Sequence, residues 1–486
     1  MQFTNIAFLF GFLPLACLFY RLCKTKKSQN LFLVITSMIF YAFGSLRSLM
    51  VLVAVLIWNY AGCRQLSLFN EEIIAGEINP NDEAYTEIRE KKKRTLIITI
   101  GIDLLILFMY RYFTGLLGTF SFLIGPVNTG EIFLMPIGLS FYLFSCMSAL
   151  FDLYRSKESC CSLVEFALFA AFFGWVNMGP IAHYDKLKDQ LNNHPLSREK
   201  LRFGAILFLQ GMCFKVVFAD NLGLIFTGLS GNTTWLGNLL LNFSYFFMIY
   251  FDFAGYSRMA RGIGSIFGFG IPRNFDHPYL ALSVQDFWRR WHISLTSWFR
   301  DYVYIPLGGN RVDQKRWIFN VLAVWLLTGI WHGFGLSFIF WGLLQGGLIL
   351  FERLVLKEKI DQWPEAARRI WVIFWELCGW TLFSSTSLMM GLSRIIRMSG
   401  IGVSAFSDSA ALFYLKNGAL LLIFCVLVIS RFGIRFGRLF RDKVLKERHL
   451  ESYWIVIRNT AYIGVFIVCL VFLIAQSAQT FLYAAF

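Results

Sequence analysis

The chain has 486 residues, of which 57% are hydrophobic and only 15% are charged, and its mean hydropathy is +0.58. Soluble globular domains carry about 25% charged residues, so this composition excludes a soluble protein and indicates a polytopic membrane protein. The formal net charge of +15 comes from Lys and Arg in short loops between apolar runs. This is the positive-inside pattern, which favours anionic lipid head groups over nucleic acid as the counter-charge.

Apolar runs of about 17 to 25 residues, which span a bilayer as helices, recur from the N-terminus onward. The first, residues 3–20, has no small-residue cleavage site after it and is predicted to be a retained helix. Arg21 and the lysines of residues 24–27 follow, which predicts a cytoplasmic loop and an N-terminus outside. Residues 31–44 and 49–62 are predicted to form the next hairpin of spans.

Residues 70–94 are the longest hydrophilic stretch and are predicted to be a variable cytoplasmic loop, because residues 91–94 are all basic. Further spans are predicted over residues 95–113, 132–151, 206–229, 236–254, 371–392, 410–429 and 455–481. Gly179-Pro180-Ile181 interrupts another apolar run, as backbone does where it turns against protein or a water-filled cavity. The expected fold is a single all-α transmembrane domain, residues 1–486, with about ten or eleven spanning helices plus re-entrant and interfacial helices.

The ten cysteines lie mostly within apolar runs, as Cys17 and Cys213 do, and include no paired C-x-x-C motif. We therefore expect buried free thiols, with neither a disulfide framework nor a zinc site. No other ligand set for a metal is visible in the sequence.

Residues 250–350 differ from the rest of the chain because titratable side chains gather there within apolar sequence. A charged group at membrane depth costs at least ~2.5 kcal/mol, so such a cluster is either tightly paired or functional. We expect this region to be the functional core. Its candidate residues are His292 and His332, together with Asp252, Asp286, Arg289, Arg290, Trp291, Arg300, Asp301, Asn310, Arg311 and Trp331.

Ser283, with Asp286 three residues later, resembles a capping box and predicts a helix that begins there and ends at Pro306. Apolar residues recur along it at spacings of three and four, which predicts an amphipathic helix. Asp286 is placed to pair with Arg289 or Arg290.

His292 shares the polar face of this predicted helix with Gln285, Arg289 and Thr296. One interpretation is an interfacial helix that lies along the head groups with a solvated His292. The other, favoured by the density of charged and aromatic residues, is a folded funnel with internal ion pairs.

His332 lies in an uncharged run, residues 317–350. As one straight helix this run would be roughly 51 Å long at 1.5 Å per residue, whereas the hydrocarbon core is about 30 Å thick. Gly329, Gly333 and Gly335 predict a break beside His332. The imidazole is then either a hydrogen-bonded core residue or an acid–base group, because His exchanges protons near neutral pH.

The central block contains ordered motifs: Tyr250-Phe251-Asp252-Phe253-Ala254-Gly255-Tyr256-Ser257, Asp286-Phe287-Trp288-Arg289-Arg290-Trp291-His292, Pro306-Leu307-Gly308-Gly309-Asn310-Arg311 and Trp331-His332-Gly333. Together they resemble the signature of membrane-bound O-acyltransferases of the alginate O-acetyltransferase type. Residues 136–142, 179–181 and 481–486 are similar to further segments of that family, whereas residues 70–94 match none. Four positions depart from its pattern: Arg258 replaces Asp, Ser145 replaces Gln, and Ser384-Ser385 replaces Phe-Arg.

The resemblance implies a tunnel through the membrane in which a cytoplasmic acyl donor meets a hydroxyl acceptor at the buried histidine. It implies that His332 is the catalytic general base and that His292 assists by hydrogen bonding, by positioning donor or acceptor, or by relaying the proton. The other candidate residues would line the tunnel or bind substrate. Acetyl-CoA is the expected donor substrate, with no bound cofactor and no metal.

The resemblance also implies partners: an extracytoplasmic polysaccharide acceptor, a separate extracytoplasmic acetyltransferase, and the lipids of the bacterial cytoplasmic membrane. The nearest alternative is transfer of D-alanine or another acyl group from a carrier protein. An alternative of another class is a polymer or lipid transporter in which the two histidines gate protons. The sequence shows no internal repeat, so it does not support a transporter built from inverted repeats.

Overall fold

The computed structural model describes residues 2–113, 115, 134–333, 335–430, 432–440, 451–475 and 481. All regular secondary structure in these residues is helical. The chain forms two compact units: unit 1 comprises Met1–Gly204, Ala260–Pro272 and Ser297–Val303, and unit 2 comprises Ala205–Met259, Arg273–Thr296 and Tyr304–Phe486. Residues 250–350, predicted to be one core, therefore contribute to both units.

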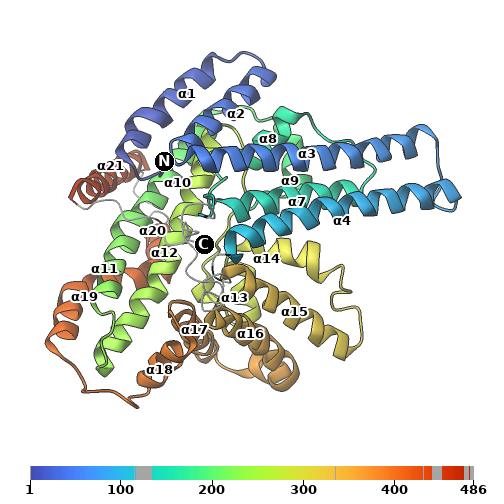
Figure 1. The fold of residues 1–486 in the computed structure, drawn as a ribbon. Coiled ribbons are helices and arrows are strands. Elements are labelled where there is room, and N and C mark those ends of the chain that lie inside the picture. The colour runs from blue at the N-terminus through green and yellow to red at the C-terminus, as the bar shows by residue number, and fades with distance from the viewer. Residues whose placement is uncertain are drawn as a thin grey trace, which may run out of the picture. The chain divides into compact units, whose positions relative to one another are not determined.

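Unit 1 contains the N-terminal helices. They are α1 (Leu13–Leu22, after a π-helix at Phe8–Phe12), α2 (Lys26–Ala42), α3 (Leu46–Ala75), α4 (Glu83–Arg111), α7 (Leu139–Arg155), α8 (Leu163–Ala171), α9 (Tyr184–Asn192) and the start of α10 (Arg198–Cys213). The long helices α3, α4 and α7 pack side by side, and α8 and α9 pack against α7 (Figure 1). Of the span predicted over residues 132–151, residues 132 and 133 lie outside the described residues.

Residues 70–94 are mostly helical, which corrects the prediction of a loop. Only residues 76–82 separate α3 from α4. The hydrophilic side chains that suggested a loop are in part buried: Lys92 is 6% exposed, and its Nζ donates to Asn70 Oδ1 at 2.6 Å. A buried polar group needs such a partner, and hydrophilicity along the sequence does not reveal it.

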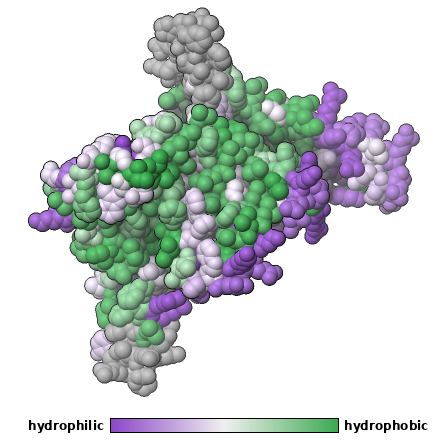
Figure 2. Space-filling model, turned by 90° about the horizontal axis from the view of Figure 1, so that it is seen from below, coloured by the Kyte–Doolittle hydropathy of each residue, from purple (hydrophilic) through white to green (hydrophobic). Residues whose placement is uncertain are grey.

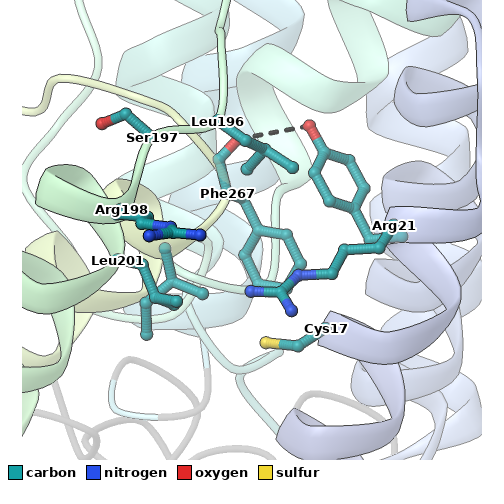
Figure 3. A pocket seen from close by; sticks show the side chains of 9 residues that line it. Cys17, Arg21, Leu196, Ser197, Arg198, Leu201 and Phe267 are labelled. Atoms are coloured by element: carbon teal, nitrogen blue, oxygen red, sulfur yellow. Dashed lines mark hydrogen bonds between the residues drawn. The ribbon is translucent and has the colours of Figure 1, made fainter.

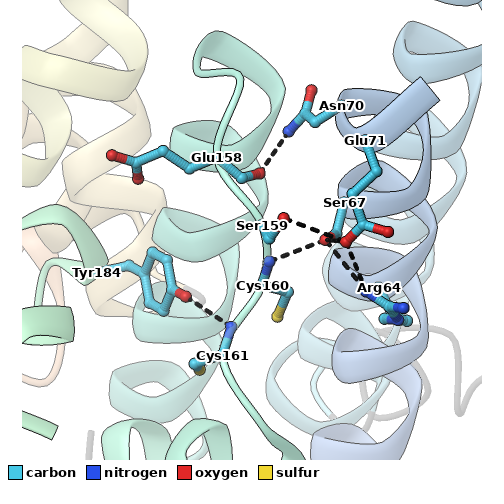
Figure 4. Close-up of polar contacts among 9 residues, drawn as sticks. All are labelled: Arg64, Ser67, Asn70, Glu71, Glu158, Ser159, Cys160, Cys161 and Tyr184. Atoms are coloured by element: carbon cyan, nitrogen blue, oxygen red, sulfur yellow. Dashed lines mark hydrogen bonds and ion pairs between the residues drawn. The ribbon is translucent and has the colours of Figure 1, made fainter. Parts of the chain in front are cut away.

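The C-terminal half of α3 faces an extended segment, residues 157–162 (Figure 4). Asn70 Nδ2 donates to Glu158 O at 2.8 Å, and Cys160 N donates to Ser67 Oγ at 2.9 Å. These bonds satisfy backbone groups that would otherwise lack partners. They tie the polar end of α3 to this segment.

The predicted interruption at Gly179-Pro180-Ile181 is confirmed, because residues 172–183 are not α-helical. Gly138, the residue before α7, has a φ of +74°, and a Cβ built on it would lie 2.3 Å from Val176 O. Both the left-handed conformation and this close approach require glycine. The segment that begins with Pro136 thus packs directly on the interrupted segment.

Unit 2 contains the remaining helices. They are α11 (Asp220–Gly228, after a π-helix at Phe214–Ala219), most of α12 (Trp235–Ile266), α13 (Val284–Arg290), part of α14 (Ile293–Phe299), α15 (Gln314–His332), α16 (Leu336–Phe351), α17 (Glu365–Phe383), α18 (Leu388–Met398), α19 (Ser409–Ile429), α20 (Phe432–Phe440) and α21 (Glu451–Ala475). From α15 to α18, each helix packs against the one before it (Figure 1). The span predicted over residues 371–392 is in fact two helices, α17 and α18, separated by residues 384–387.

Among the described residues, five helices are long and apolar enough to cross a membrane: Leu46–Ala75, Arg198–Gly228, Leu336–Gln362, Ser409–Ile429 and Tyr453–Ala475. The larger number predicted included apolar runs that the structure breaks or shortens, such as α7. Many large hydrophobic side chains are exposed, and hydrophobic residues cover much of the face shown in Figure 2. Such surface is stable against lipid rather than water, so the chain is an all-α, multi-pass membrane protein.

Candidate active site

His332 is the last residue of α15, and its side chain is only 3% exposed. Among the described residues, aromatic rings lie close to it: the centroid of its ring lies 4.5 Å from that of Trp331 and 5.0 Å from those of Trp341 and Phe383. The Trp341 ring is perpendicular to the imidazole, at 90°. The imidazole is therefore held in one orientation by apolar walls that limit the access of water.

The predicted break at His332 is confirmed, because α15 ends there and α16 begins at Leu336. The chain turns back on itself, and α15 packs closely against α16. A Cβ on Gly342 would lie 2.4 Å from Trp325 O, and one on Gly329 would lie 2.5 Å from Phe338 O. Glycines thus let the two helix backbones approach, which fixes the turn that presents His332.

The single helix predicted from Ser283 to Pro306 is wrong. α13 ends at Arg290, α14 begins at Ile293, and His292 lies in the break with a φ of +43°. This left-handed conformation is uncommon for a residue other than glycine. As a consequence, residues 285, 289, 292 and 296 do not share one helical face.

The start of that helix was predicted correctly. Ser283 is the N-cap, and its Oγ accepts a hydrogen bond from Asp286 N at 3.0 Å. Asp286 Oδ1 pairs with Arg290 Nε at 2.9 Å, one of the two pairings predicted.

Asn274 holds the break in place. Its Oδ1 lies 3.3 Å from His292 Nδ1 and accepts from Ser294 N and Ser294 Oγ at 3.0 Å, while its backbone oxygen accepts from Ile293 N at 2.9 Å. On another side, the Phe253 ring meets the imidazole edge to face at 4.6 Å. His292 is 2% exposed, so it is buried and not solvated as the interfacial interpretation requires.

Burial lowers the pKa of His292 to about 3, because removal from water disfavours the charged form. The residue lies outside the five helices that are long enough to span a membrane. The neutral imidazole can therefore donate or accept a hydrogen bond over the physiological pH range. It does not supply a positive charge there.

A cluster of tryptophans connects the two histidine segments within unit 2. Trp291, which precedes His292, lies 4.7 Å from Trp380 between ring centroids; Trp380 lies 6.0 Å from Trp341, which in turn contacts His332. These rings are almost fully buried. The structure thus places the two imidazoles at either end of one aromatic cluster.

A polar network that the sequence did not predict runs beside this cluster. Trp288 Nε1 donates to Gln345 Oε1 at 3.0 Å, and Gln345 Nε2 donates to Glu376 Oε2 at 3.3 Å. Gln345 and Glu376 are fully buried. Glu376 is the lone acid within the run at residues 371–392, and an acid in such an apolar run indicates a paired or functional group.

Asp252 belongs to a buried ion cluster in unit 2. Lys215 Nζ lies 2.8 Å from Asp252 Oδ1 and 2.7 Å from Asp220 Oδ1, and all three side chains are at most 7% exposed. Burial of a charge is tolerated when it is paired in this way. Lys215 was missed, although a lysine inside a predicted span is itself an indication of a paired or functional group.

Most of the other predicted residues are less enclosed. Arg289, Arg300, Asn310 and Arg311 are exposed, Asp286, Arg290 and Asp301 are half-buried, and Trp291 and Trp331 are buried. Arg300 and Asp301 lie in unit 1, where they pair with each other at 2.7 Å. Asn310 and Arg311 lie in a loop that Asn320 Nδ2 holds through Leu307 O at 3.2 Å and Gly309 O at 3.1 Å.

Unit 1 contains a further buried imidazole that was not predicted as a site residue. His183 is 6% exposed, and its Nε2 lies 3.3 Å from Ser297 Oγ. Its ring stacks on Tyr302 at 5.7 Å, and the Tyr302 hydroxyl donates to Asp152 Oδ1 at 2.9 Å. Neither the Gly-Pro-Ile motif nor residue spacing indicated this cluster, because its members come from three separate segments.

A multi-pass helical membrane protein with imidazoles buried in helix breaks has the groups needed for acid–base chemistry away from bulk water. Residues 102–395 match the model of the membrane-bound O-acyltransferase (MBOAT) family, and the chain belongs to this family. The family membership that the motifs predicted is thereby confirmed. The protein is a membrane-bound O-acyltransferase.

The chain is 35% identical to "Probable alginate O-acetylase AlgI" of Azotobacter vinelandii, over 90% of this chain and 85% of that protein. It is 32% identical to "Peptidoglycan O-acetyltransferase" of Helicobacter pylori, over 71% of this chain and 69% of that protein. It is also 33% identical to "Teichoic acid D-alanyltransferase" of Bacillus subtilis, over 37% of this chain and 49% of that protein.

Proposed function

We propose that the protein transfers an acetyl group from cytoplasmic acetyl-CoA to a hydroxyl group of an extracytoplasmic cell-envelope polysaccharide. It would act in the bacterial cytoplasmic membrane together with a separate extracytoplasmic acetyltransferase. The observation that carries the chemistry is His332, a buried imidazole at a chain reversal between aromatic walls. The names of the relatives from A. vinelandii and H. pylori support a polysaccharide acceptor.

In this proposal His332 takes the proton from the acceptor hydroxyl while the hydroxyl oxygen attacks the carbonyl carbon of the thioester. The carbon–sulfur bond breaks, and the proton passes to the thiolate, which gives an O-acetyl ester and free CoA thiol. General base catalysis of this kind contributes ~10² to 10⁴ in rate. The aromatic walls favour transfer over hydrolysis because they exclude water that would compete with the hydroxyl.

His292 acts in support. Because the pKa of this imidazole is low, it is neutral at physiological pH and acts through a hydrogen bond. The contact between its Nδ1 and Asn274 Oδ1 orients the ring. It would position a substrate or relay a proton and would not stabilise charge as a cation. Asp252, Arg289 and the other predicted tunnel-lining residues remain candidates for substrate contacts.

The donor can be tested with inside-out membrane vesicles that contain the full-length protein. Radiolabelled acetyl-CoA added outside such vesicles reaches the cytoplasmic face, and we expect label to appear on a luminal acceptor polysaccharide when the partner transferase is present. Right-side-out vesicles are the control and should give no transfer. Label transfer in right-side-out vesicles only would reverse the proposed direction.

A second donor is favoured by the similarity to the B. subtilis D-alanyltransferase. In that case a carrier protein charged with D-alanine, and not acetyl-CoA, would support transfer in inside-out vesicles. Running both donors in the same preparation separates the two reactions. If neither donor supports transfer, the transporter alternative is favoured over both acyl-transfer reactions.

A further inference from the structure

Unit 1 contains a hollow of about 210 Å³ (Figure 3). Its lining residues include neither His292 nor His332. Its lining comes from α1, from the start of α10 and the residues before it, and from the end of α12. The apolar part of the lining is formed by Cys17, Leu196, Leu201, Ile266 and Phe267. Tyr20, which is buried, donates from its hydroxyl to Phe267 O at 3.3 Å and so ties α1 to the end of α12.

Two arginines give the hollow its charge. Arg21 from α1 and Arg198 from the first position of α10 extend their guanidinium groups into the same space from opposite sides, with the Phe267 side chain between them (Figure 3). Both are exposed. The first turn of α10 adds the partial positive charge of a helix N-terminus.

Two lysines beside the hollow reinforce the positive field. Lys26 Nζ donates to His194 O at 3.0 Å, and Lys200 Nζ donates to Gly268 O at 2.6 Å. The pKa of His194 is lowered to about 4, first by burial and then by the charges of both lysines. The two lysines therefore act on the same buried imidazole.

No acid forms an ion pair with these cations in the part of the chain that the structure describes, and Glu199, in the same first turn of α10, is exposed. None of the four cations, Arg21, Lys26, Arg198 and Lys200, has a carboxylate oxygen within 4 Å there. A cationic hollow without an internal counter-charge is suited to an anionic ligand that carries several acceptor oxygens, and arginine pairs bind phosphate in this way.

The surroundings indicate what carries the phosphate. Leu18 and Leu22 on α1 and Phe203 on α10 are at least half exposed, so the two helices that carry the arginines also carry exposed apolar side chains. The volume of the hollow lies below the ~300 to 1,000 Å³ of sites that enclose a whole small molecule. A head group fits such a space while its acyl chains lie outside, along the apolar surface.

We propose that Arg21 and Arg198 bind the phosphate of an anionic phospholipid, whose acyl chains lie along α1 and α10. The loop at residues 24–27 is predicted to be cytoplasmic, and anionic lipids are enriched in the cytoplasmic leaflet. The site is independent of the proposed acetyl transfer. The other source of such a phosphate is the acyl donor, since CoA also carries phosphate groups.

Native mass spectrometry of the full-length protein in detergent tests this site without an activity readout. Dioleoyl phosphatidylglycerol, the zwitterionic phosphatidylcholine with the same chains, and free CoA would be titrated separately. We expect phosphatidylglycerol to bind at least about tenfold more tightly than phosphatidylcholine, and each of Arg21→Gln and Arg198→Gln to weaken it about tenfold, as for the loss of a charge-assisted hydrogen bond.

The single variant Arg89→Gln is the matched control, because it removes one positive charge, as each arginine variant does, from an exposed residue of α4 in the same unit. It should bind phosphatidylglycerol like the wild type. Cys17→Phe places a larger side chain in the apolar part of the lining without a change of charge, and it should also weaken binding. This variant tests the site independently of the arginine variants, so the test stands if one of those folds poorly. Unchanged binding in Arg21→Gln, Arg198→Gln and Cys17→Phe would overturn the proposal, as would an equal loss in the control. Binding of CoA that depends on both arginines and displaces the lipid would assign the hollow to the donor instead.

Discussion

The turn between α15 and α16 and the break between α13 and α14 each present one buried histidine, yet they are built differently. At the first, glycines allow two helices to pack closely, and His332 itself is the last residue of a regular helix with aromatic rings around it. At the second, the histidine itself adopts the left-handed conformation, and Asn274 supplies the hydrogen bonds that hold it.

The comparison shows two ways to fix an imidazole. The close approach of two helix backbones and the surrounding aromatic rings position the His332 side chain. At His292, by contrast, the left-handed backbone of the residue itself forms part of the break that presents the imidazole. A left-handed residue other than glycine costs of order 1–3 kcal/mol, which the surrounding hydrogen bonds must offset. Substitution of His292 therefore tests structure and chemistry together unless the backbone is matched.

The largest effect is expected at His332. His332→Gln and His332→Ala should abolish acyl transfer, with a loss of at least the ~10² to 10⁴ that a general base contributes, and should leave the amount of protein in the membrane unchanged. Initial rates in vesicles with donor and partner supplied would measure this. Transfer at the wild-type rate in either variant would show that His332 is not the base.

A smaller loss is expected at His292. His292→Asn keeps a side chain that tolerates a left-handed backbone but removes the imidazole, so it should retain a trace of activity. A lost supporting hydrogen bond in a dry site costs ~2.7 to 4 kcal/mol, by analogy with removal of an oxyanion donor. Turnover should fall more than the affinity for a non-hydrolysable acetyl-CoA analogue, as single-turnover assays and calorimetry would show.

His277→Asn is the control for that variant, because His277 has a similar φ of +48° in the same unit. It should transfer like the wild type. Complete loss in His292→Asn, equal to that in His332→Gln, would mean that the two imidazoles act as one catalytic unit. Normal turnover would remove His292 from the mechanism.

The glycine packing that fixes His332 can be tested through stability. Gly342→Ala places a Cβ 2.4 Å from Trp325 O, and such overpacking costs ~1 to 3 kcal/mol, so both the melting temperature and the rate of transfer should fall. Gly347→Ala is the matched control on the same helix, since a Cβ there meets nothing within 4 Å. Equal melting temperatures in the two variants would mean that the close approach of α15 and α16 is not required.

The smallest perturbation tests the predicted topology. Lys27→Cys and Lys93→Cys, both at exposed positions, should react with an impermeant thiol reagent only from the cytoplasmic side, once the half-buried native cysteines are replaced by serine. Lys26 and Lys92 are unsuitable because their ammonium groups make hydrogen bonds within unit 1. Labelling from outside intact cells would reverse the orientation of the protein and the direction of transfer.

The local sequence determined several features. The composition established a helical membrane protein, the ordered motifs established its family, and the glycines around His332 together with the length of its apolar run predicted the break there. The N-cap at Ser283 also followed from spacing alone. These features depend on neighbouring residues or on the bilayer thickness, both of which can be read along the chain.

Only the tertiary structure decided the rest. The break at His292 depends on Asn274, 18 positions away, and the burial of Lys92 depends on Asn70. The pairing of Asp252 with Lys215 likewise joins two helices that each look apolar in sequence. In each case a polar or strained group is stabilised by a partner that is distant along the chain, and helix periodicity carries no information about such partners because it records only which residues share one face of one helix.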